Sequence, residues 1–319
     1  MKVLVTGVTG FVGKETVRAL IAKGHTVHGA VRREGVDMPA CEAMHVVGDI
    51  GAMTDWRAAL QGVDAVVHLA ARAHVLNESH DSPLTLFRAV NTQGTLALAR
   101  HCLDAGVKRF VFVSSIGVNG AHTETAPFRE TDVPNPAADY ALSKLEAETA
   151  LKDLLAGSSM TLVIVRPPLV YAGNAPGNFR RLLGLVDSGI PLPFASIDNR
   201  RSMVALENLA DFLTVCVSHS QAANQLFLIA DGTDVSLPQI LRSLAEGMNK
   251  APRLLPFPGA LLSLGASMVG KAALYRQLCG SLIVDASHAR SLLGWQPIIG
   301  TEEALRRAGR DFFAQKPMR

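Results

Sequence analysis

The residues best suited to acid–base chemistry are a tyrosine and a lysine four positions apart, Tyr140 and Lys144. The pattern around them predicts a helix over 139–156, and this spacing places both side chains on one helix face, one turn apart. A phenol has a pKa of about 10 and is a poor acid or base at neutral pH. A neighbouring ammonium stabilises the phenolate and brings that pKa closer to the working range. Because such pairs also occur by chance on exposed helices, the assignment needs support from other residues.

Three glycines close to the amino terminus indicate a nucleotide-binding turn. Gly7, Gly10 and Gly13 directly follow a short apolar run, and a helical pattern over 11–23 and a second strand over 26–31 come next. A strand, a glycine turn, a helix and a parallel strand form a right-handed dinucleotide-binding unit. The glycines allow a sharp turn, an approach to a pyrophosphate and close helix–strand packing. The helix amino terminus then faces the phosphates with free N–H groups.

Strand-like and helical runs alternate through the first half of the chain. Short, valine-rich apolar runs are typical of buried parallel strands, and their alternation with helices predicts an α/β fold with a doubly wound parallel (Rossmann) sheet. The predicted strands are 3–6, 27–31, 43–47, 65–68, 109–114 and 161–165, and the predicted helices are 11–23, 54–60, 83–105 and 139–156.

Beyond residue 166 prolines and glycines punctuate irregular segments, and only 205–217 and 225–229 still resemble elements of the sheet layers. Ligands of doubly wound sheets bind beyond the carboxyl ends of the strands, so we interpret the remainder as a smaller, discontinuous substrate domain. The predicted division is 1–166 plus about 205–230 for the cofactor domain, and 167–204 plus 231–319 for the substrate domain.

Composition narrows the class of protein. The chain has 319 residues, 48% of them hydrophobic and 18% charged, with a net charge of +3, so it can bury a large core. It has no long run of lysine and arginine, which argues against a nucleic-acid partner. The four cysteines lie far apart with no metal-ligand spacing, so we expect no metal and a reducing, cytoplasmic location. Met1 leads directly into a strand, so no signal peptide is expected.

The most apolar late segment covers residues 258–270. It is too short and too interrupted by glycine to cross a bilayer, so no membrane span is expected. We interpret it as a helix that covers a substrate cleft, with a position on a membrane surface as the alternative.

The end of the second strand bears on the choice of cofactor. NAD enzymes usually place an acid there to hold the ribose 2′-hydroxyl. Here Val31 occupies that position, and Arg32 and Arg33 follow it. Two cations without an acid favour a 2′-phosphate and therefore NADP, while a solvated arginine pair with NAD as the cofactor is the alternative.

Residues after the third and fourth strands are suited to hold the rest of a dinucleotide. Asp49 could accept a hydrogen bond from an adenine amino group, and the small residues Ala70 and Ala71 would let the backbone pass close to the cofactor. Asn91 lies within a helical pattern, where asparagine is a poor helix former. A buried asparagine needs hydrogen-bond partners, so Asn91 is a candidate for a supporting role.

The motifs together resemble those of the extended short-chain dehydrogenase/reductases. Thr6-Gly-Val-Thr-Gly-Phe-Val-Gly13 is similar to their glycine fingerprint, and Tyr140 and Lys144 to their catalytic pair. Ser115-Ile-Gly-Val-Asn-Gly120 aligns with their S/T-x-x-V-Y-G, with Asn119 in place of the tyrosine. The resemblance therefore selects Ser115, and not its neighbour Ser114, as the hydroxyl that orients the substrate oxygen.

The resemblance extends over nearly the whole chain. Arg166-Pro-Pro-Leu-Val-Tyr171 is similar to the family's RPxxVYG and would place Pro168 and Val170 against the nicotinamide. The implied cofactor contacts are Gly7, Thr9, Gly10, Phe11, Val12, Gly13, Arg32, Arg33, Asp49, Ile50, Leu69, Ala70, Ala71, Asn91, Tyr140, Lys144, Pro168 and Val170. The implied substrate contacts are His74, Ser115, Asn178, Arg201 and Arg276, where the arginines would bind a diphosphate. Surface arginines are the alternative for both cations.

The resemblance is to nucleotide-sugar enzymes of the UDP-glucose 4-epimerase type. It implies hydride transfer between a nicotinamide and C4 of a UDP-sugar, with Tyr140 as general acid/base and Lys144 lowering its pKa. A 4-epimerase retains NAD, whereas a 4-ketoreductase consumes NADPH. The arginine pair favours the reductase, and 71–76 resembles enzymes that reduce UDP-4-keto-6-deoxy-N-acetylglucosamine for surface polysaccharides.

Two further implications concern assembly and class. The family pattern implies a homodimer through the helices at 83–105 and 139–156. Some relatives bind NADP only as sensors or scaffolds, but these have lost the tyrosine or the lysine. This chain keeps both, so an enzyme is the expected class.

Overall fold

The computed structural model describes residues 1–35, 41–73 and 82–315. Within them, seven strands form one parallel sheet in the order β3-β2-β1-β4-β5-β6-β9. The strand order reverses between β1 and β4, which is where doubly wound sheets bind their ligands. The predicted Rossmann fold is confirmed.

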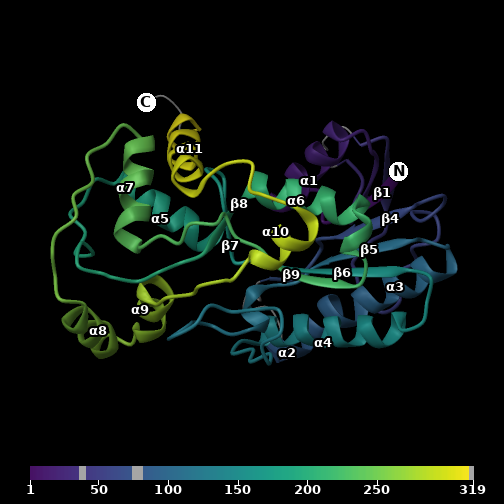
Figure 1. The fold of residues 1–319 in the computed structure, drawn as a ribbon, viewed down its shortest axis with the longest axis horizontal. Helices are drawn as coiled ribbons and strands as arrows, with labels where there is room; N and C mark the ends of the chain where they lie inside the picture. Colours follow the sequence, from purple (N-terminus) through teal and green to yellow (C-terminus); the bar gives the residue numbers. More distant parts are fainter. Residues whose placement is uncertain (36–40, 74–81, 316–319) are drawn as a thin grey trace.

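The sheet of Figure 1 carries helices on both faces. On one face α1, α6 and α10 pack through the apolar cluster that contains Leu20, Phe212 and Trp295. On the other face α3 and α4 pack through the cluster that contains Leu98 and Leu151. The central strands are therefore buried on both sides, which explains their nearly continuous apolar sequences.

The described strands are β1 Lys2–Thr6, β2 Thr26–Val31, β3 Ala43–Val46, β4 Ala65–His68, β5 Arg109–Val113, β6 Thr161–Arg166, β7 Leu169–Tyr171, β8 Met203–Ala205 and β9 Gln225–Leu228. The described helices are α1 Phe11–Ala22, α2 Pro83–Phe87, α3 Thr95–Asp104, α4 Asp139–Leu155, α5 Gly177–Asp187, α6 Leu206–Ser218, α7 Leu237–Gly247, α8 Gly259–Met268, α9 Ala272–Cys279, α10 Ser287–Leu293 and α11 Thr301–Ala314. The π-helical segment is η1 Arg88–Gly94, and the short 3₁₀ turns are η2 Ile116–Val118 and η3 Ser220–Ala222.

A second lobe lies beside the main sheet (Figure 1). The two-stranded parallel sheet β7-β8 leads into it, and α5, α7 and α11 enclose an apolar core that contains Phe179, Leu241 and Leu305. Figure 1 shows this lobe at the left, with α8 and α9 below it. Leu293 and Trp295 belong to the predicted substrate domain but pack into the core beneath the main sheet. The predicted division into two domains stays a prediction.

Two predicted helices differ from the structure. Residues 54–60 form turns around the buried Trp56, so the helix prediction there was wrong. The cause is local, because the Asp55 carboxylate accepts a hydrogen bond from the backbone N–H of Arg57 at 3.0 Å, and such side-chain bonds compete with helical ones. The helix at 83–105 is present but widens into the π-helical segment η1. No helix among the described residues is long and apolar enough to cross a membrane.

Candidate active site

The glycine turn after β1 forms a tight cradle. Gly7 has φ +67°, and a Cβ on it would lie 2.8 Å from the backbone nitrogen of Ala70. A Cβ on Gly13 would lie 2.2 Å from the Gly7 carbonyl oxygen, so α1 packs directly on the turn. Gly10 is the N-cap of α1 and has no side chain to satisfy its first N–H groups. These groups are available to a phosphate, and a dinucleotide therefore fits this turn.

A buried hydrogen-bond chain fixes the loop opposite the cradle. The Thr6 hydroxyl accepts from the backbone N–H groups of Leu69 and Ala70, at 3.2 and 3.1 Å. Its own hydrogen points to His68 Nδ1 at 2.7 Å, and His68 Nε2 lies 2.9 Å from the hydroxyl of Thr95. Burial lowers the pKa of His68 to about 3, so its ring is neutral. The loop is thereby held within reach of the glycine turn.

Asn91 holds the same loop from the other side. Its carboxamide accepts from the backbone N–H of Arg72 at 2.8 Å and donates to the carbonyl of Arg72 at 3.0 Å. It also donates to the hydroxyl of Ser143 on α4 at 3.0 Å. Asn91 lies inside η1, and π-helical segments are frequent at functional sites. The structure thus gives this buried asparagine the partners that the sequence demands.

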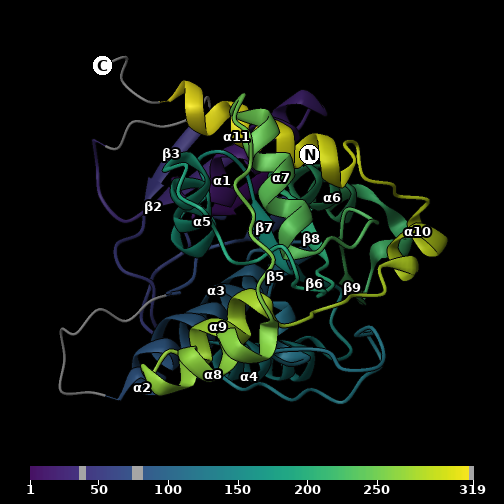
Figure 2. The same ribbon diagram turned by 90° about the vertical axis from the view of Figure 1, so that its left-hand side faces the viewer.

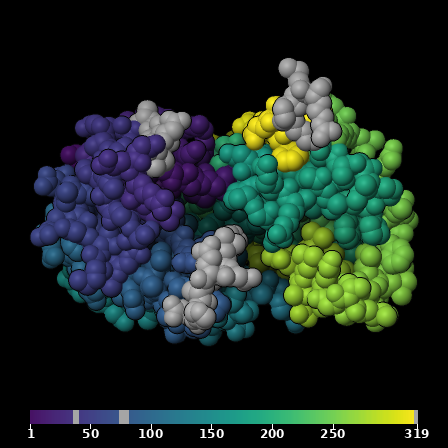
Figure 3. Space-filling model, turned by 180° about the vertical axis from the view of Figure 1, so that it is seen from behind, coloured from purple at the N-terminus to yellow at the C-terminus, as the bar shows by residue number. Residues whose placement is uncertain are grey.

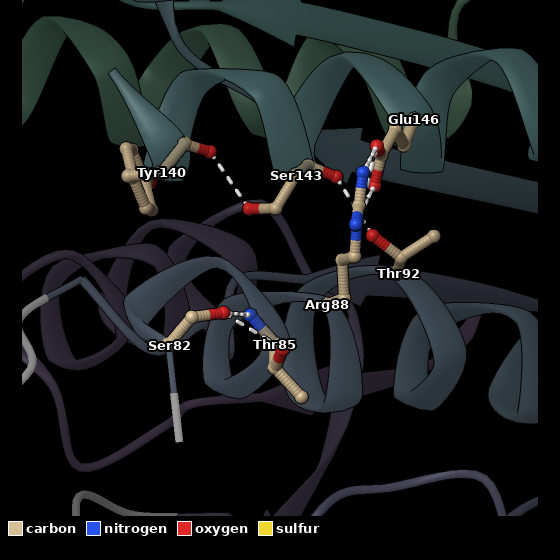
Figure 4. Close-up of polar contacts among 7 residues, drawn as sticks. All are labelled: Ser82, Thr85, Arg88, Thr92, Tyr140, Ser143 and Glu146. Carbon is tan, nitrogen blue, oxygen red and sulfur yellow. Dashed lines mark hydrogen bonds and ion pairs between the residues drawn. The ribbon is translucent and has the colours of Figure 1, made fainter. Parts of the chain in front are cut away.

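Tyr140 and Lys144 lie one turn apart at the start of α4. The hydroxyl of Ser143 donates to the carbonyl of Tyr140 at 2.7 Å, and Thr92 donates to the carbonyl of Ser143 at 2.9 Å (Figure 4). The Tyr140 ring meets Phe87 edge-on, with 5.9 Å between centroids. These contacts tie the first turn of α4 to α2 and η1.

The ammonium of Lys144 is buried beside the tyrosine. Its Nζ donates to the carbonyl of Val113 at 2.9 Å, at the carboxyl end of β5. It lies 4.6 Å from the centroid of the Phe112 ring and 6.0 Å from that of Tyr140. Burial lowers the pKa of Lys144 to about 7 and raises the pKa of Tyr140 to about 12. Burial therefore favours the neutral form of each group.

Ser114 and Ser115 follow β5 and differ in their surroundings. The Ser115 oxygen accepts from the backbone N–H of Gly117 at 3.1 Å, which caps η2 and leaves its hydrogen available to donate. Within the described residues the oxygen of Ser114 is buried without a hydrogen-bond partner. The resemblance-based choice of Ser115 stays a prediction, and the structure is compatible with it.

A buried ion pair supports α4, the helix that carries Tyr140 and Lys144. The guanidinium of Arg166 contacts Glu148 through two hydrogen bonds, at 2.9 and 2.5 Å, with both side chains at most 3% exposed. A third donor of Arg166 reaches the side-chain oxygen of Asn119 at 2.9 Å, and Asn119 in turn donates to the carbonyl of Arg129. Asn119, which stands where the resembled motif has tyrosine, thus accepts the third hydrogen bond of the Arg166 guanidinium.

The adenosine end of the predicted site is open. Arg32 Nη1 lies 3.6 Å from Asp49 Oδ1, with both side chains mostly exposed, and Arg33, the next residue, is also exposed. Ile50 faces η1, because a Cβ on Gly94 would lie 2.5 Å from its Cγ2. Asp49, the predicted adenine contact, therefore lies next to Arg32, a predicted 2′-phosphate cation.

The remaining predicted cofactor contacts follow the same edge of the sheet. Thr9 is exposed in the glycine turn, Val12 packs against the core under α1, and Phe11 packs against the second lobe. Pro168 and Val170 flank Leu169 directly after β6, so they lie at the carboxyl end of the parallel strands.

A cavity of about 350 Å³ opens in the second lobe next to Leu169. Asn178 and Arg201, both predicted to bind substrate, line it. Most of the other lining side chains are apolar: Leu169, Phe179, Leu182, Leu185, Met203, Leu237, Ile240, Leu274 and Leu278, with Arg181 and Gln277. Arg201 donates to the carbonyl oxygens of Gln277 and Gly280, at 2.6 and 3.2 Å, and so links the cavity to the end of α9.

Three predicted substrate contacts remain: Ser115, which follows β5 as described above, Arg276 and His74. The side chain of Arg276 is exposed on α9, whereas the next residue, Gln277, lines the cavity. His74 lies outside the described residues. Residues 258–270 were predicted to cover a substrate cleft. Within the described chain the cavity is lined by residues of α9 and not by residues of α8.

Sequence reasoning missed the hydrogen-bond chain through His68 and the pair between Arg166 and Glu148. A signal existed for the first, because Thr6 and His68 are polar residues that end two apolar strands. The register pairs them directly across β1 and β4. No comparable signal marks Glu148, which reads as an ordinary helix residue.

The family model for the NAD dependent epimerase/dehydratase family matches residues 3–230. The chain belongs to this family. It is an enzyme of the extended short-chain dehydrogenase/reductase type, and the resemblance inferred from its motifs is confirmed.

Known relatives and structures cover almost the full length. A UDP-glucose 4-epimerase from Vibrio cholerae is 43% identical over 312 residues, which is 97% of this chain and 95% of that protein. An N-acetyl-alpha-D-glucosaminyl-diphospho-ditrans,octacis-undecaprenol 4-epimerase from Escherichia coli O157:H7 is 27% identical over 267 residues, covering 82% and 77%. The crystal structure of a UDP-glucuronic acid 4-epimerase from Bacillus cereus with NAD has a TM-score of 0.78 at 20% identity, covering 99% and 97%, and supports the fold.

Proposed function

We propose that this enzyme transfers a hydride between a nicotinamide cofactor and C4 of a UDP-sugar. The observation that carries the proposal is the placement of Tyr140 and Lys144 at the carboxyl end of β5. They share that edge of the sheet with the glycine cradle of β1 and the fixed loop after β4. A dinucleotide bound along this edge of the sheet would bring its nicotinamide ring to the phenol of Tyr140.

The proposal gives a role to each of Tyr140, Lys144 and Ser115. Tyr140 gives a proton to the sugar oxygen during reduction and takes one during oxidation. The ammonium of Lys144, held by the Val113 carbonyl, offsets the burial that raises the pKa of Tyr140. Ser115 uses its remaining O–H to orient the sugar oxygen. When bound, the nicotinamide supplies or accepts the hydride.

The chain's own residues would hold the cofactor along this edge. The N–H groups at the start of α1 bind the pyrophosphate, since Gly10 leaves them without a capping side chain. Thr6 and Asn91 fix the loop at 69–72 so that its backbone faces the cofactor. Leu69, Ala70 and Ala71 are the loop residues predicted to touch it.

A UDP-sugar is supported by the second-lobe cavity and by the relatives. Arg201 is a forked cation that suits a diphosphate, and Asn178 lies in the same cavity. The Vibrio cholerae relative is named for UDP-glucose, and the Escherichia coli relative for an undecaprenol-linked sugar. The latter supports a place in surface-polysaccharide synthesis.

We infer a 4-ketoreductase that uses NADPH, on a UDP-4-keto-6-deoxy-N-acetylhexosamine. The support is Arg32 and Arg33 after β2, where an acid would favour NAD. A UDP-hexose or UDP-N-acetylhexosamine 4-epimerase with retained NAD is the second candidate. It is favoured by the Vibrio cholerae 4-epimerase at 43% identity and by the NAD-dependent family.

One experiment separates the two candidates. The purified chain is mixed with NADPH and UDP-4-keto-6-deoxy-N-acetylglucosamine, and absorbance at the reduced-nicotinamide band is followed. The reductase predicts loss of absorbance and no conversion of UDP-glucose. Stable absorbance together with interconversion of UDP-glucose and UDP-galactose would overturn the reductase in favour of the epimerase.

A second measurement tests the class itself. Titration calorimetry with NADPH and NADH should show binding of at least one of them. No binding of either would remove the basis for any hydride-transfer role. Binding without turnover of any sugar nucleotide would instead favour a sensor or scaffold. The proposed homodimer through the segments 83–105 and 139–156 is checked by light scattering of the same sample.

A further inference from the structure

The helix α8 is exposed along one apolar face. Leu261, Leu264 and Met268 are 54%, 59% and 81% exposed, and α8 has no buried residue. Their spacing of three and four residues places them on one helix face. The segment before α8 adds Leu255 and Phe257, which are 53% and 40% exposed. These five exposed apolar residues, all within residues 255–268, are referred to below as the α8 patch.

The α8 patch differs from the other exposed apolar residues. Met53 and Val133 are more exposed than most of the patch, at 94% and 86%, but each lies alone in a separate loop. Single exposed apolar residues are normal on protein surfaces, whereas a contiguous patch marks an interaction site. Figure 2 shows α8 and α9 side by side at the front of the molecule, and Figure 3 shows the yellow-green lobe they form projecting at the lower right.

The charge of the segment around α8 indicates what kind of surface the α8 patch would contact. Residues 250–280 contain no aspartate or glutamate and four cations, Lys250, Arg253, Lys271 and Arg276. Lys250 pairs with Asp187, and the other three are exposed. An exposed apolar helix face on a segment that carries cations and no acids suits the surface of a bilayer with anionic lipids. Contact with a second copy of this chain would leave these cations without an acidic counterpart from the same segment.

The patch also adjoins the cavity. The hydroxyl of Tyr275 on α9 donates to the carbonyl of Gly259 at 3.0 Å, which ties the first residue of α8 to α9. From the same helix Leu274 and Leu278 line the cavity, and Leu274 is itself 48% exposed. Exposed apolar side chains therefore lie on both α8 and α9, and α9 also lines the cavity.

We propose that the α8 patch docks this enzyme on the surface of a bilayer that contains anionic phospholipids. The apolar face enters the boundary between headgroups and acyl chains, and Arg253, Lys271 and Arg276 contact phosphate groups. This mode needs no spanning helix. It is independent of the reductase or epimerase assignment, because a docked enzyme can serve either reaction.

The test measures vesicle binding by co-sedimentation of the full chain. Vesicles of phosphatidylcholine alone are compared with vesicles that also contain phosphatidylglycerol. The wild type is expected to bind the anionic vesicles, and added salt should weaken that binding. The double variant Leu264→Glu, Met268→Glu should bind roughly tenfold more weakly, because carboxylates would face the anionic surface.

The matched control is the double variant Met53→Glu, Val133→Glu. It adds the same charge at exposed apolar residues outside the patch, so its vesicle binding should equal that of the wild type. Both variants should keep the wild-type melting temperature and NADPH affinity, since all four side chains are exposed.

Three results would overturn the proposal. The wild type could fail to bind the anionic vesicles. The control variant could lose binding to the same degree as the α8 variant, which would reflect net charge alone. Light scattering could show a dimer that the α8 substitutions convert to monomer, which would assign the patch to a second copy of the chain.

Discussion

Helix α4 buries polar side chains, whereas helix α8 exposes apolar ones. On α4 the buried Ser143, Lys144 and Glu148 each have a polar partner at hydrogen-bond distance. On α8 no residue is buried, and Leu264 and Met268 face solvent. Burying a charge is costly unless it is paired, so α4 holds its groups in one geometry. The comparison shows two uses of a helix: α4 holds buried polar groups in fixed positions, as the proposed acid/base step needs, whereas α8 exposes an apolar face, as the proposed docking needs.

The strongest test of this contrast is the pH dependence of stability at Lys144. Its pKa is 10.5 in an unfolded chain and about 7 in the folded protein, because burial penalises the ammonium. Between these values the unfolded state binds more protons, so the free energy of unfolding rises with pH. The difference corresponds to roughly 5 kcal/mol at about 1.36 kcal/mol per pKa unit.

Lys144→Met should remove this rise, as measured by urea unfolding from pH 7 to pH 10. Lys152→Met on the same helix is the control, because Lys152 is exposed. It should leave the slope unchanged. Equal slopes for the wild type and Lys144→Met would show that Lys144 is not buried as described.

The second test compares two ion pairs on α4. Glu148 pairs with Arg166 in the interior, and Glu146 pairs with Arg88 on the surface (Figure 4). Glu148→Ala leaves a buried guanidinium without its acid and should cost about 3 to 5 kcal/mol of unfolding free energy. Glu146→Ala should cost far less, because water screens the exposed pair. Similar losses in urea unfolding would contradict the contrast between interior and surface.

The third test concerns the chemical step. Tyr140→Phe removes the proposed acid/base and should lower the turnover number by about a thousandfold, because positioned proton transfer contributes that order of rate. The NADPH dissociation constant from calorimetry should stay within about twofold, since the ring contact with Phe87 is retained. Tyr275→Phe, which removes a hydroxyl on α9, is the control and should keep turnover. An active Tyr140→Phe enzyme would refute the proposed role.

The smallest expected effect is at the open adenosine end. Arg32→Ala combined with Arg33→Ala should weaken NADPH binding by roughly tenfold and leave NADH binding unchanged, because only NADPH carries the 2′-phosphate. Arg18→Ala removes another exposed cation on α1 and is the control. Equal losses for NADPH and NADH would remove the support for NADP.

The same contrast explains what the sequence could predict. Local patterns suffice for the glycine turn and for the valine-rich strands, because a Rossmann unit is built from consecutive elements. The spacing of Tyr140 and Lys144 is also local. The partners of Asn91 come from Arg72 and Ser143, which no local pattern connects to it. In the second lobe, β7 and β8 pair across many residues, and the cavity they support could not be derived from spacing.

The hydrogen-bond chain through His68 has a consequence for acid tolerance. Thr95 gives its hydrogen to the Asn91 carbonyl at 2.7 Å, so it must receive one from His68 Nε2, and Nδ1 must receive the hydrogen of Thr6. All the hydrogens point one way, from the glycine turn toward η1. A second proton on the imidazole would sit on Nδ1 and would point at the hydrogen of the Thr6 hydroxyl, so the Nδ1 hydrogen bond would be lost. The alignment of the nucleotide cradle is therefore insulated from ordinary acidification of its surroundings, and it keeps one geometry while the neighbouring lysine titrates.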